Sequence, residues 1–165
     1  MGFFDKLFGK SEKNKSDLIY APMAGQVVDI TEVPDPVFAE GMLGKGVAVL
    51  PAEGNVFAPT DGVISMMFDT GHALSLTSAS GAEILIHVGL ETVTLQGKPF
   101  ISHVKNGDKV KKGQLLLQVD LQAIEDAGLP TITPVIICNS DDYSVFRGIT
   151  GQAVTKGDIV IELVK

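Results

Sequence analysis

Two of the three histidines, His72 and His87, lie in β-like runs on either side of residues 78–81, whose sequence is SASG. Four residues is a common length for a hairpin loop, and the glycine supplies the unusual backbone dihedral at its end. A four-residue loop makes His72 and His87 direct cross-strand partners, with Cβ atoms about 5 Å apart on one face. The spacing therefore predicts two imidazoles that face one small volume.

Two adjacent imidazoles suit only a few kinds of chemistry. Histidine has an ordinary pKa of about 6.5, so each ring is mostly neutral at pH 7 and offers one lone pair and one N–H donor. One ring could accept a phosphoryl group while the other donates a hydrogen bond to the phosphoryl oxygens. The same pair could supply half of a tetrahedral zinc site. The alternative is a pair packed in the core, with each ring bonded to a backbone carbonyl.

The neighbouring residues favour a functional pair over a packed one. Thr70 places a hydroxyl close by, and Gly71 and Gly89 allow backbone or a partner to approach closely. Val88 and Leu90 provide an apolar rim. We therefore expect a polar pair inside an apolar rim, as at a docking site for another protein.

Length and composition set the frame around this pair. A chain of 165 residues favours a single domain whose core is large enough to fold without cross-links. Cys138 is the only cysteine, which excludes an internal disulfide, and we expect its thiol to be buried in an apolar strand. The net charge of -7 argues against nucleic acid as a partner. The sequence has no apolar run of about 18 residues and no secretory signal core, so we expect a cytoplasmic protein.

The pattern of apolar runs and turn residues from residue 18 onward predicts the fold. Short apolar runs alternate with Gly, Pro, Asn and Asp, and the 18 glycines and 8 prolines leave little room for long helices. We predict an all-β fold, an antiparallel β-sandwich and barrel hybrid with one or two short helices. The best helix covers residues 121–127. Two pairs of similar segments predict internal duplication: 21–27 with 58–63, and 108–117 with 154–161.

We interpret residues 1–17 as an N-terminal tail, separate from a domain that covers residues 18–165. Four apolar side chains share one helical face, and the residues after them are polar. These four are Phe3, Phe4, Leu7 and Phe8. We expect a flexible tail that makes weak contact with an anionic membrane surface, through these side chains and the lysines among them.

The other candidate sites have simpler explanations. His103 precedes a Lys-rich turn and is interpreted as exposed and idle, and residues 140–143 are interpreted as a solvated loop. Lys111 and Lys112 sit in a turn that resembles lipoyl and biotinyl carriers. They lack the flanking Met or acidic residues of such carriers, so we interpret them as ordinary turn residues.

Taken together, these segments resemble the glucose-type enzyme IIA of the bacterial phosphoenolpyruvate-dependent sugar phosphotransferase system, over essentially the whole chain. The resemblance rests on the opening residues 2–7 (GFFDKL), on the Ala-Pro pairs at 21–22 and 58–59, on residues 70–73 (TGHA), and on residues 86–93 (IHVGLETV). It implies a phosphotransferase-system component that accepts a phosphoryl group from the carrier HPr and passes it to the IIB domain of a sugar permease. No cofactor and no stand-alone turnover are implied.

The resemblance also implies roles for individual residues. By motif position, His87 is the phosphoacceptor, modified on its tele nitrogen, His72 supports phosphoryl transfer, and Thr70 belongs to the hydrogen-bond network around His72. The partner-binding rim is assigned to four residues: Phe68, Val88, Leu90 and Glu91. Well-known members carry Asp at the position of Glu91 and an aromatic residue at that of Val88.

A regulatory role follows from the same resemblance. The unphosphorylated form is expected to dock on regulated proteins such as glycerol kinase, sugar permeases and adenylate cyclase. The family precedent is an intermolecular zinc site with glycerol kinase, in which His72 and His87 are joined by a carboxylate of the partner and a water. The expected location is the cytoplasm, with transient contact at the inner face of the membrane.

Two alternatives of other classes stay open at this point. A zinc-dependent hydrolase on a related β scaffold needs a third protein ligand, for which Glu83, Glu91 and His103 are the candidates. A purely regulatory binding module would use the histidine patch only for docking, and phosphorylation would only switch that docking.

Overall fold

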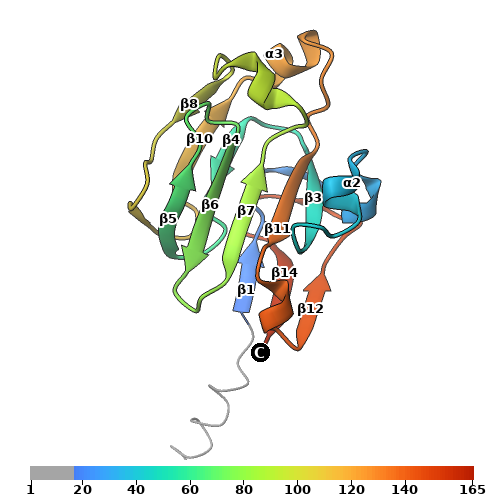
Figure 1. The fold of residues 1–165 in the computed structure, drawn as a ribbon, viewed down its shortest axis with the longest axis vertical. Coiled ribbons are helices and arrows are strands. Elements are labelled where there is room, and N and C mark those ends of the chain that lie inside the picture. The colour runs from blue at the N-terminus through green and yellow to red at the C-terminus, as the bar shows by residue number, and fades with distance from the viewer. Residues whose placement is uncertain (1–16) are drawn as a thin grey trace, which may run out of the picture.

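The computed structural model describes residues 17–165, and the strands in this part of the chain form three antiparallel sheets (Figure 1). This arrangement confirms the predicted all-β class. The largest sheet has eight strands, in the order β13 (Ala153–Val154), β2 (Gly25–Asp29), β3 (Lys45–Pro51), β11 (Thr133–Ile137), β7 (Glu83–His87), β6 (Ala73–Ser78), β5 (Gly62–Met67) and β9 (Lys109–Val110).

Two smaller sheets complete the sandwich. One contains β1 (Asp17–Tyr20), β14 (Ile159–Val164) and β12 (Val145–Gly148), and the other contains β4 (Asn55–Phe57), β10 (Leu115–Val119) and β8 (Phe100–Ser102). A single apolar core joins all three sheets, with Ile19, Leu74, Ile84, Leu117 and Ile161 among its fully buried members. Residues 1–16, which hold nearly all of the expected tail, lie outside the described part.

The helical elements are short, as predicted. They are α2 (Pro36–Ala39), α3 (Leu121–Asp126) and three 3-10 turns, η1 (Ile30–Glu32), η2 (Thr92–Leu95) and η3 (Ser140–Asp142). The predicted helix is α3: the Asp120 side chain accepts a hydrogen bond from the Ala123 amide, and Gly128 follows with φ +77°.

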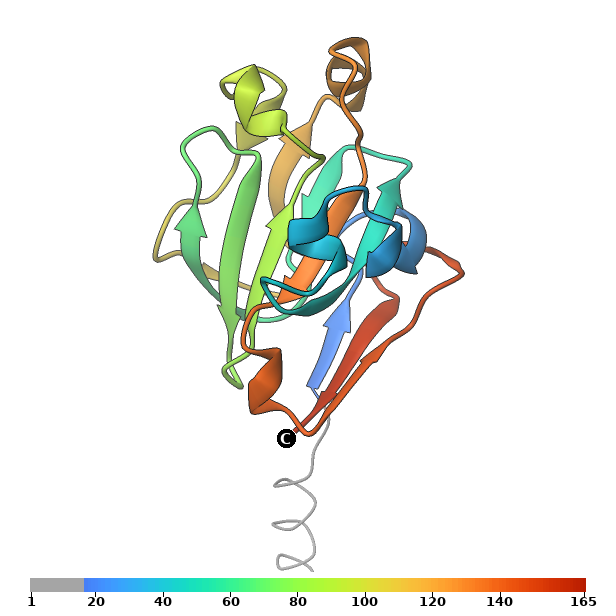
Figure 2. The ribbon, with the colours of Figure 1, turned by 45° about the vertical axis from the view of Figure 1, so that its right-hand side comes forward.

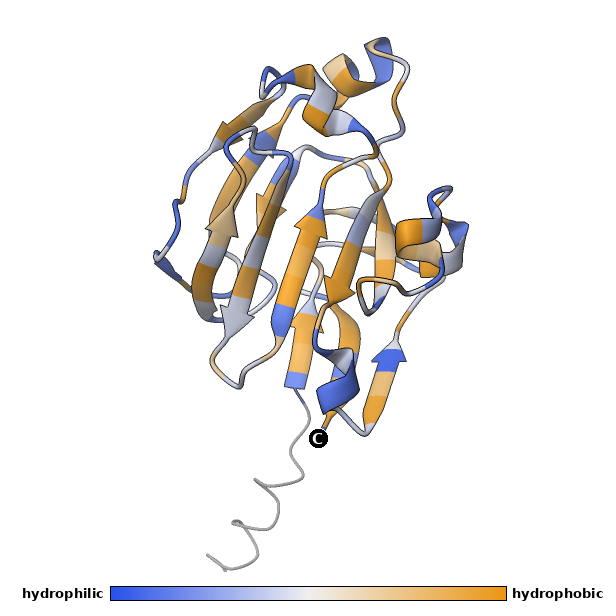
Figure 3. Ribbon diagram, in the orientation of Figure 1, coloured by the Kyte–Doolittle hydropathy of each residue, from blue (hydrophilic) through white to orange (hydrophobic). Residues whose placement is uncertain are grey.

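A second, smaller core lies on the other face of the large sheet, where α2 covers β3 and β11 (Figure 2). It brings Phe38 of α2 against Ala48, Ile136 and Leu90. Because both faces of the sheet are covered here, the central strands carry continuous apolar runs instead of an alternating pattern, as the colouring of β7 and β11 shows (Figure 3). Cys138 follows β11 and is exposed, so the prediction of a buried thiol was wrong.

The predicted internal duplication is visible as a reciprocal exchange of backbone hydrogen bonds. The amide of Tyr20 donates to the carbonyl of Pro59 at 2.9 Å, and the amide of Phe57 donates to the carbonyl of Pro22 at 2.7 Å. The two Ala-Pro segments noted in the sequence therefore bind each other in matching ways.

The two Lys-Gly turns continue this correspondence. Lys112 Nζ lies 3.9 Å from the centre of the Tyr20 ring, and Lys156 Nζ lies 4.5 Å from the centre of the Phe57 ring. Each turn places its lysine over an aromatic ring: the first turn over the residue before one Ala-Pro pair, and the second over the residue before the other. Lys112 thus has a structural contact, consistent with its interpretation as a turn residue.

Candidate functional site

The β6–β7 hairpin carries the two histidines, in a register one residue away from the predicted one. Ala73, not His72, pairs with His87. The amide of Ser78 donates to the carbonyl of Ala82 at 2.8 Å, so the loop has three residues, 79–81, and ends with Gly81 at φ +99°. The four-residue loop was therefore wrong.

The rings still meet because His72 lies outside the regular strand. It follows a turn in which the Gly71 amide donates to the Phe68 carbonyl at 2.8 Å, and β6 begins only at Ala73. The amide of Val88 donates to the His72 carbonyl at 2.8 Å, which ties the two backbone segments together. The ring centroids are 5.1 Å apart, and the ring planes are inclined by 81°.

Gly71 is required for this turn. Its φ is +71°, in the left-handed region that favours glycine, and a Cβ atom there would lie 2.9 Å from the Phe100 Cβ. Any larger residue would therefore push the turn away from β8 and move His72.

The hydrogen bond of His87 fixes its tautomer. Its Nδ1 lies 2.7 Å from the carbonyl oxygen of Gly89, which can only accept, so Nδ1 carries the proton. Nε2 consequently keeps its lone pair, and this nitrogen is the nucleophilic one. The pairing of β7 with β11 ends at Ile86, because the residue of β11 opposite His87 is Pro134, which has no N–H to donate.

His72 is held by Thr70. The Thr70 hydroxyl and His72 Nδ1 form a short hydrogen bond, and the His72 side chain is only 6% exposed. A hydroxyl can donate or accept, so this bond leaves both tautomers of His72 available. When the hydroxyl donates, His72 carries its proton on Nε2 and becomes a donor toward the space between the rings.

Electrostatics keep both rings neutral. Burial lowers the pKa of His72, and a positive charge on His87 would lower it further. Burial also lowers the pKa of His87, and it outweighs the opposing effects of the Gly89 carbonyl, Asp35 and Glu91. At pH 7 the site therefore offers neutral imidazoles, one of which has a fixed lone pair.

The apolar surroundings differ from the predicted rim. Phe68 is 40% exposed and packs edge-on against His72, with centroids 5.3 Å apart, and Glu91 is exposed. Val88 and Leu90 are 0% and 4% exposed, because they pack into the two cores. These two side chains therefore face the interior and cannot form a rim against a partner.

Sequence reasoning missed Phe38 as a neighbour of His87. Its ring lies 5.2 Å from the His87 ring, and its side chain is buried under α2. The Asp-Pro pair at 35–36 was the available signal, because it starts a helix: Asp35 accepts from the Val37 amide at 3.0 Å and Pro36 fills the first turn. Val37, the next residue in the same helix, is 39% exposed.

The geometry around the pair does not supply a complete metal site. Residues 17–165 contain no group of three or more His, Cys, Asp or Glu side chains arranged to hold an ion. Of the three proposed third ligands, Glu83 lies at the far end of β7 and His103 is bonded to Gln118 at 2.8 Å. Glu91 is close enough to affect His87 but is exposed and forms no such group with the two histidines. The hydrolase alternative therefore finds no support among these residues.

None of the helices in residues 17–165 has the length and apolar character of a membrane span.

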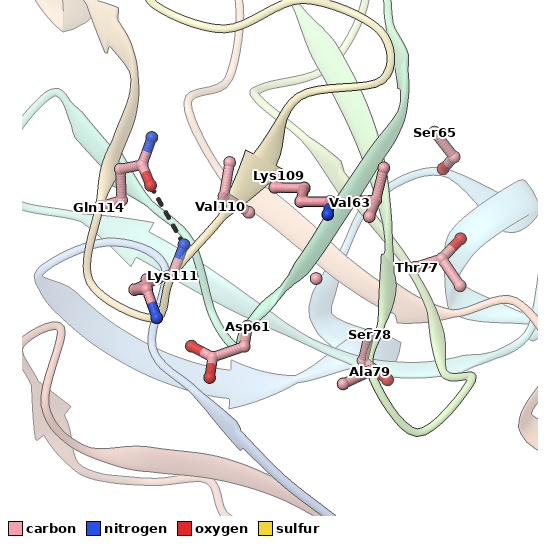
Figure 4. A pocket seen from close by; sticks show the side chains of 11 residues that line it. Asp61, Val63, Ser65, Thr77, Ser78, Ala79, Lys109, Val110, Lys111 and Gln114 are labelled. Atoms are coloured by element: carbon pink, nitrogen blue, oxygen red, sulfur yellow. Dashed lines mark hydrogen bonds between the residues drawn. The ribbon is translucent and has the colours of Figure 1, made fainter.

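A separate pocket of about 720 Å³ lies beside β5, β6 and β9 (Figure 4). Thr77 and Ala79 line it at the end of β6 opposite to His72, roughly 17 Å along the strand. Lys109 reaches across the pocket beside Val63 (Figure 4). The pocket shares no residue with the histidine site.

Comparison with known proteins places these features in a family. Residues 17–143 match the family model described as "phosphoenolpyruvate-dependent sugar phosphotransferase system, EIIA 1". The chain is 47% identical over 154 residues to the glucose-specific EIIA component of the PTS system of Bacillus cereus, covering 93% of both chains.

Two further proteins are similar to the chain. It is 45% identical over 144 residues to the beta-glucoside-specific EIIBCA component of Dickeya chrysanthemi, covering 87% of this chain and 22% of that one. Among solved structures, the glucose permease IIA from Mycoplasma capricolum matches with a TM-score of 0.83 and 34% identity, covering 90% of this chain and 96% of that one.

Proposed function

The chain belongs to the EIIA 1 family of the phosphoenolpyruvate-dependent sugar phosphotransferase system, and on this premise we propose that it carries its phosphoryl group on His87 Nε2. It is a phosphoryl carrier that receives the group from phosphorylated HPr and passes it to the IIB domain of a sugar permease. The hydrogen bond from His87 Nδ1 to the Gly89 carbonyl carries the residue assignment, because it leaves the lone pair on Nε2.

The transfer needs no movement of a proton on His87. As the N–P bond on HPr breaks, the new bond forms to the Nε2 lone pair, and the proton stays on Nδ1. The ring then holds a positive charge that the Gly89 carbonyl stabilises. This charge makes the ring a good leaving group, so the phosphoryl group remains transferable to IIB. Positioning and electrostatics do most of the work in phosphoryl transfer.

We assign His72 to the phosphoryl oxygens. With the Thr70 hydroxyl donating to Nδ1, the Nε2–H of His72 is a donor next to the His87 ring. The phosphoryl group adds close to two negative charges, which need donors in a site flanked by the apolar rings of Phe38 and Phe68. Thr70 is then a positioning residue for this donor.

The acceptor assignment is tested by labelling. Phosphoenolpyruvate, enzyme I and HPr should add one acid-labile, base-stable phosphoryl group, and His87→Ala should abolish it. His103→Ala is the matched control and should label normally, because His103 is exposed and its ring is bonded to Gln118, away from the histidine pair. Label that persists in His87→Ala and maps to His72 would overturn the assignment.

Docking on regulated proteins in the unphosphorylated form is a second proposed role. In both rings Nδ1 is already engaged, by Thr70 and by Gly89, so Nε2 is the free nitrogen of each. Two neutral nitrogens on adjacent rings can bind zinc if a partner's carboxylate and a water complete the tetrahedron. Phosphorylation of His87 removes one ligand, so docking of this kind is restricted to the unphosphorylated form.

We further propose that residues 1–17 hold the carrier near its permease. The apolar side chains Phe3, Phe4, Leu7 and Phe8 and the neighbouring lysines suit weak adsorption to anionic lipid. Ordering the segment costs roughly 1 to 2 kcal/mol per residue, which offsets most of the gain. The binding is therefore weak and reversible. The glucose-type permease is the proposed destination, since the relative from Bacillus cereus is named glucose-specific.

A further inference from the structure

The carbonyl that accepts the hydrogen bond from His87 Nδ1 belongs to a peptide group held at both ends. Its oxygen, on Gly89, accepts from His87 Nδ1 at 2.7 Å. Its N–H, on Leu90, donates to the Pro130 carbonyl at 3.2 Å. The loop between α3 and β11 therefore sets the orientation of the group that selects the His87 tautomer.

The preceding peptide group is held by a buried threonine. Thr92 is 0% exposed, and its hydroxyl donates to the Val88 carbonyl at 2.5 Å. Its methyl group packs beside Gly89: a Cβ atom at that glycine would lie 2.7 Å from Thr92 Cγ2 and 2.7 Å from the Pro130 oxygen. The same two groups that bond to the turn thus also enclose it.

Gly89 needs this external support because glycine imposes little preference on its own backbone. Its φ is +73°, and glycine visits positive and negative φ almost equally. The direction of the Gly89 carbonyl must therefore be set by the peptide groups on both sides. Pro130 holds one side through Leu90, and Thr92 holds the other through Val88.

We infer that Thr92 is a positioning residue for phosphoryl transfer, which acts through Gly89 to keep the proton of His87 on Nδ1. The inference rests on the proposed role of His87 as phosphoacceptor. Thr92 touches neither ring in a hydrogen bond of its own. Removal of its hydroxyl leaves the Val88 carbonyl without this donor and frees the turn to rotate, which weakens the acceptor that fixes the tautomer.

A matched control lies two residues away. Thr94 also sits in η2, and its hydroxyl donates to the Glu91 carbonyl at 2.7 Å, but it is exposed and does not reach the peptide groups of residues 88–90. Thr94→Val therefore removes a comparable hydroxyl from the same element. Thr92→Ser keeps the hydroxyl of interest and removes only the methyl group.

The experiment measures the tautomer and the rate separately. The ¹⁵N chemical shifts of the His87 ring are recorded in the full chain, without any phosphoryl donor, and phosphorylation by HPr is timed in parallel. In the starting protein Nδ1 should give a protonated shift and Nε2 an unprotonated one. In Thr92→Val the two shifts should move toward each other, and phosphorylation should slow by about tenfold. Thr92→Ser and Thr94→Val should change neither.

Thr92→Ala is a second hydroxyl-free variant, should Thr92→Val fail to fold. Unchanged ring shifts in a folded hydroxyl-free variant would overturn the inference, whether or not the rate falls, because a purely structural role predicts slower transfer with the same tautomer. The shift measurement requires no transfer. It therefore decides whether Thr92 fixes the tautomer of His87 even if labelling were to show that another residue accepts the phosphoryl group.

Discussion

The rings of His72 and His87 meet edge to face, with centroids 5.1 Å apart and planes inclined by 81°. In this arrangement one ring can present a nitrogen to a group that the other ring carries. The contact therefore separates two roles, acceptance on His87 and stabilisation by His72.

Replacement of His72 by Gln should uncouple these roles. Gln retains an N–H donor near the same place but loses the bond that Thr70 makes to Nδ1. His72→Gln should still be labelled on His87 by HPr, while onward transfer to IIB should fall by about tenfold or more, because such a donor stabilises the transferring group. Rapid-quench measurement of both steps checks this. Onward transfer at the unaltered rate would remove His72 from the mechanism.

Acidification should destabilise the fold through the two rings. Their pKa values in the folded chain are lowered by burial, whereas an unfolded histidine has a pKa of about 6.5. Between the lowered values and 6.5 the unfolded chain binds more protons, so stability falls as the pH falls in this window. Above it, the rings contribute no pH dependence.

Melting temperatures between pH 7.5 and 5 test this effect. The double variant His72→Gln/His87→Gln should lose less stability on acidification than the original chain. His103→Gln should behave like the original chain. Equal slopes for the double variant and the original chain would contradict the prediction.

Substitution of Gly89 should be far more damaging than substitution of Gly81. Both have positive φ, which costs alanine about 1 to 2 kcal/mol. At Gly81 a Cβ atom would meet nothing within 4 Å, whereas at Gly89 it would clash with Pro130 and Thr92. Gly89→Ala should therefore lose about 1 to 3 kcal/mol more than Gly81→Ala in chemical denaturation. Equal losses would show that the turn relaxes freely.

Zinc should strengthen docking of the unphosphorylated chain on a regulated partner such as glycerol kinase. The free Nε2 atoms of His72 and His87 supply two ligands, and the partner supplies a carboxylate. Calorimetry with zinc and with a chelator should differ by at least about tenfold in affinity, or 1.4 kcal/mol. His103→Gln is the control. An affinity independent of zinc would count against the site.

Vesicle flotation of the full chain tests the membrane proposal. Binding should be measurable on anionic vesicles, weaker on neutral ones and reduced by salt, because the lysines near the N-terminus contribute about 1 kcal/mol each. A Phe4→Ser/Leu7→Ser variant should bind less, and Val145→Ser, on the exposed surface of β12, should not. Equal binding to neutral vesicles would contradict the electrostatic part.

The fold class and the helix at 121–126 were predictable because turn residues and capping signals act locally. The hairpin register was not, since three-residue and four-residue loops both end at Gly81. The predicted rim failed at Val88 and Leu90 for a related reason. Both faces of the large sheet are covered, so apolar residues occur on both sides of its strands. The sequence therefore does not show whether an apolar residue near the histidines is buried in one of the two cores or exposed at the surface.

The histidine pair was predicted correctly although the predicted register was wrong. His72 lies at the end of a turn, before β6 begins, so the alternation of side chains along a strand does not decide which way its ring points. The Gly89 carbonyl and Thr92 were beyond sequence reasoning. The turn that they form is also held by Pro130, which comes from a loop remote in the chain and contacts the turn only in the folded protein.

The pairing of β1 with β14 has a consequence for biosynthesis. Asp17 pairs with Leu163, so the first described strand can pair with β14 only after residues 17–163 have all been synthesised and have left the ribosome. Until then β1 presents an open edge, and the nascent protein depends on late, long-range closure. Closure of this small sheet should therefore be a late step of folding, and chains stalled before residue 159 should be the ones that chaperones and proteases recognise.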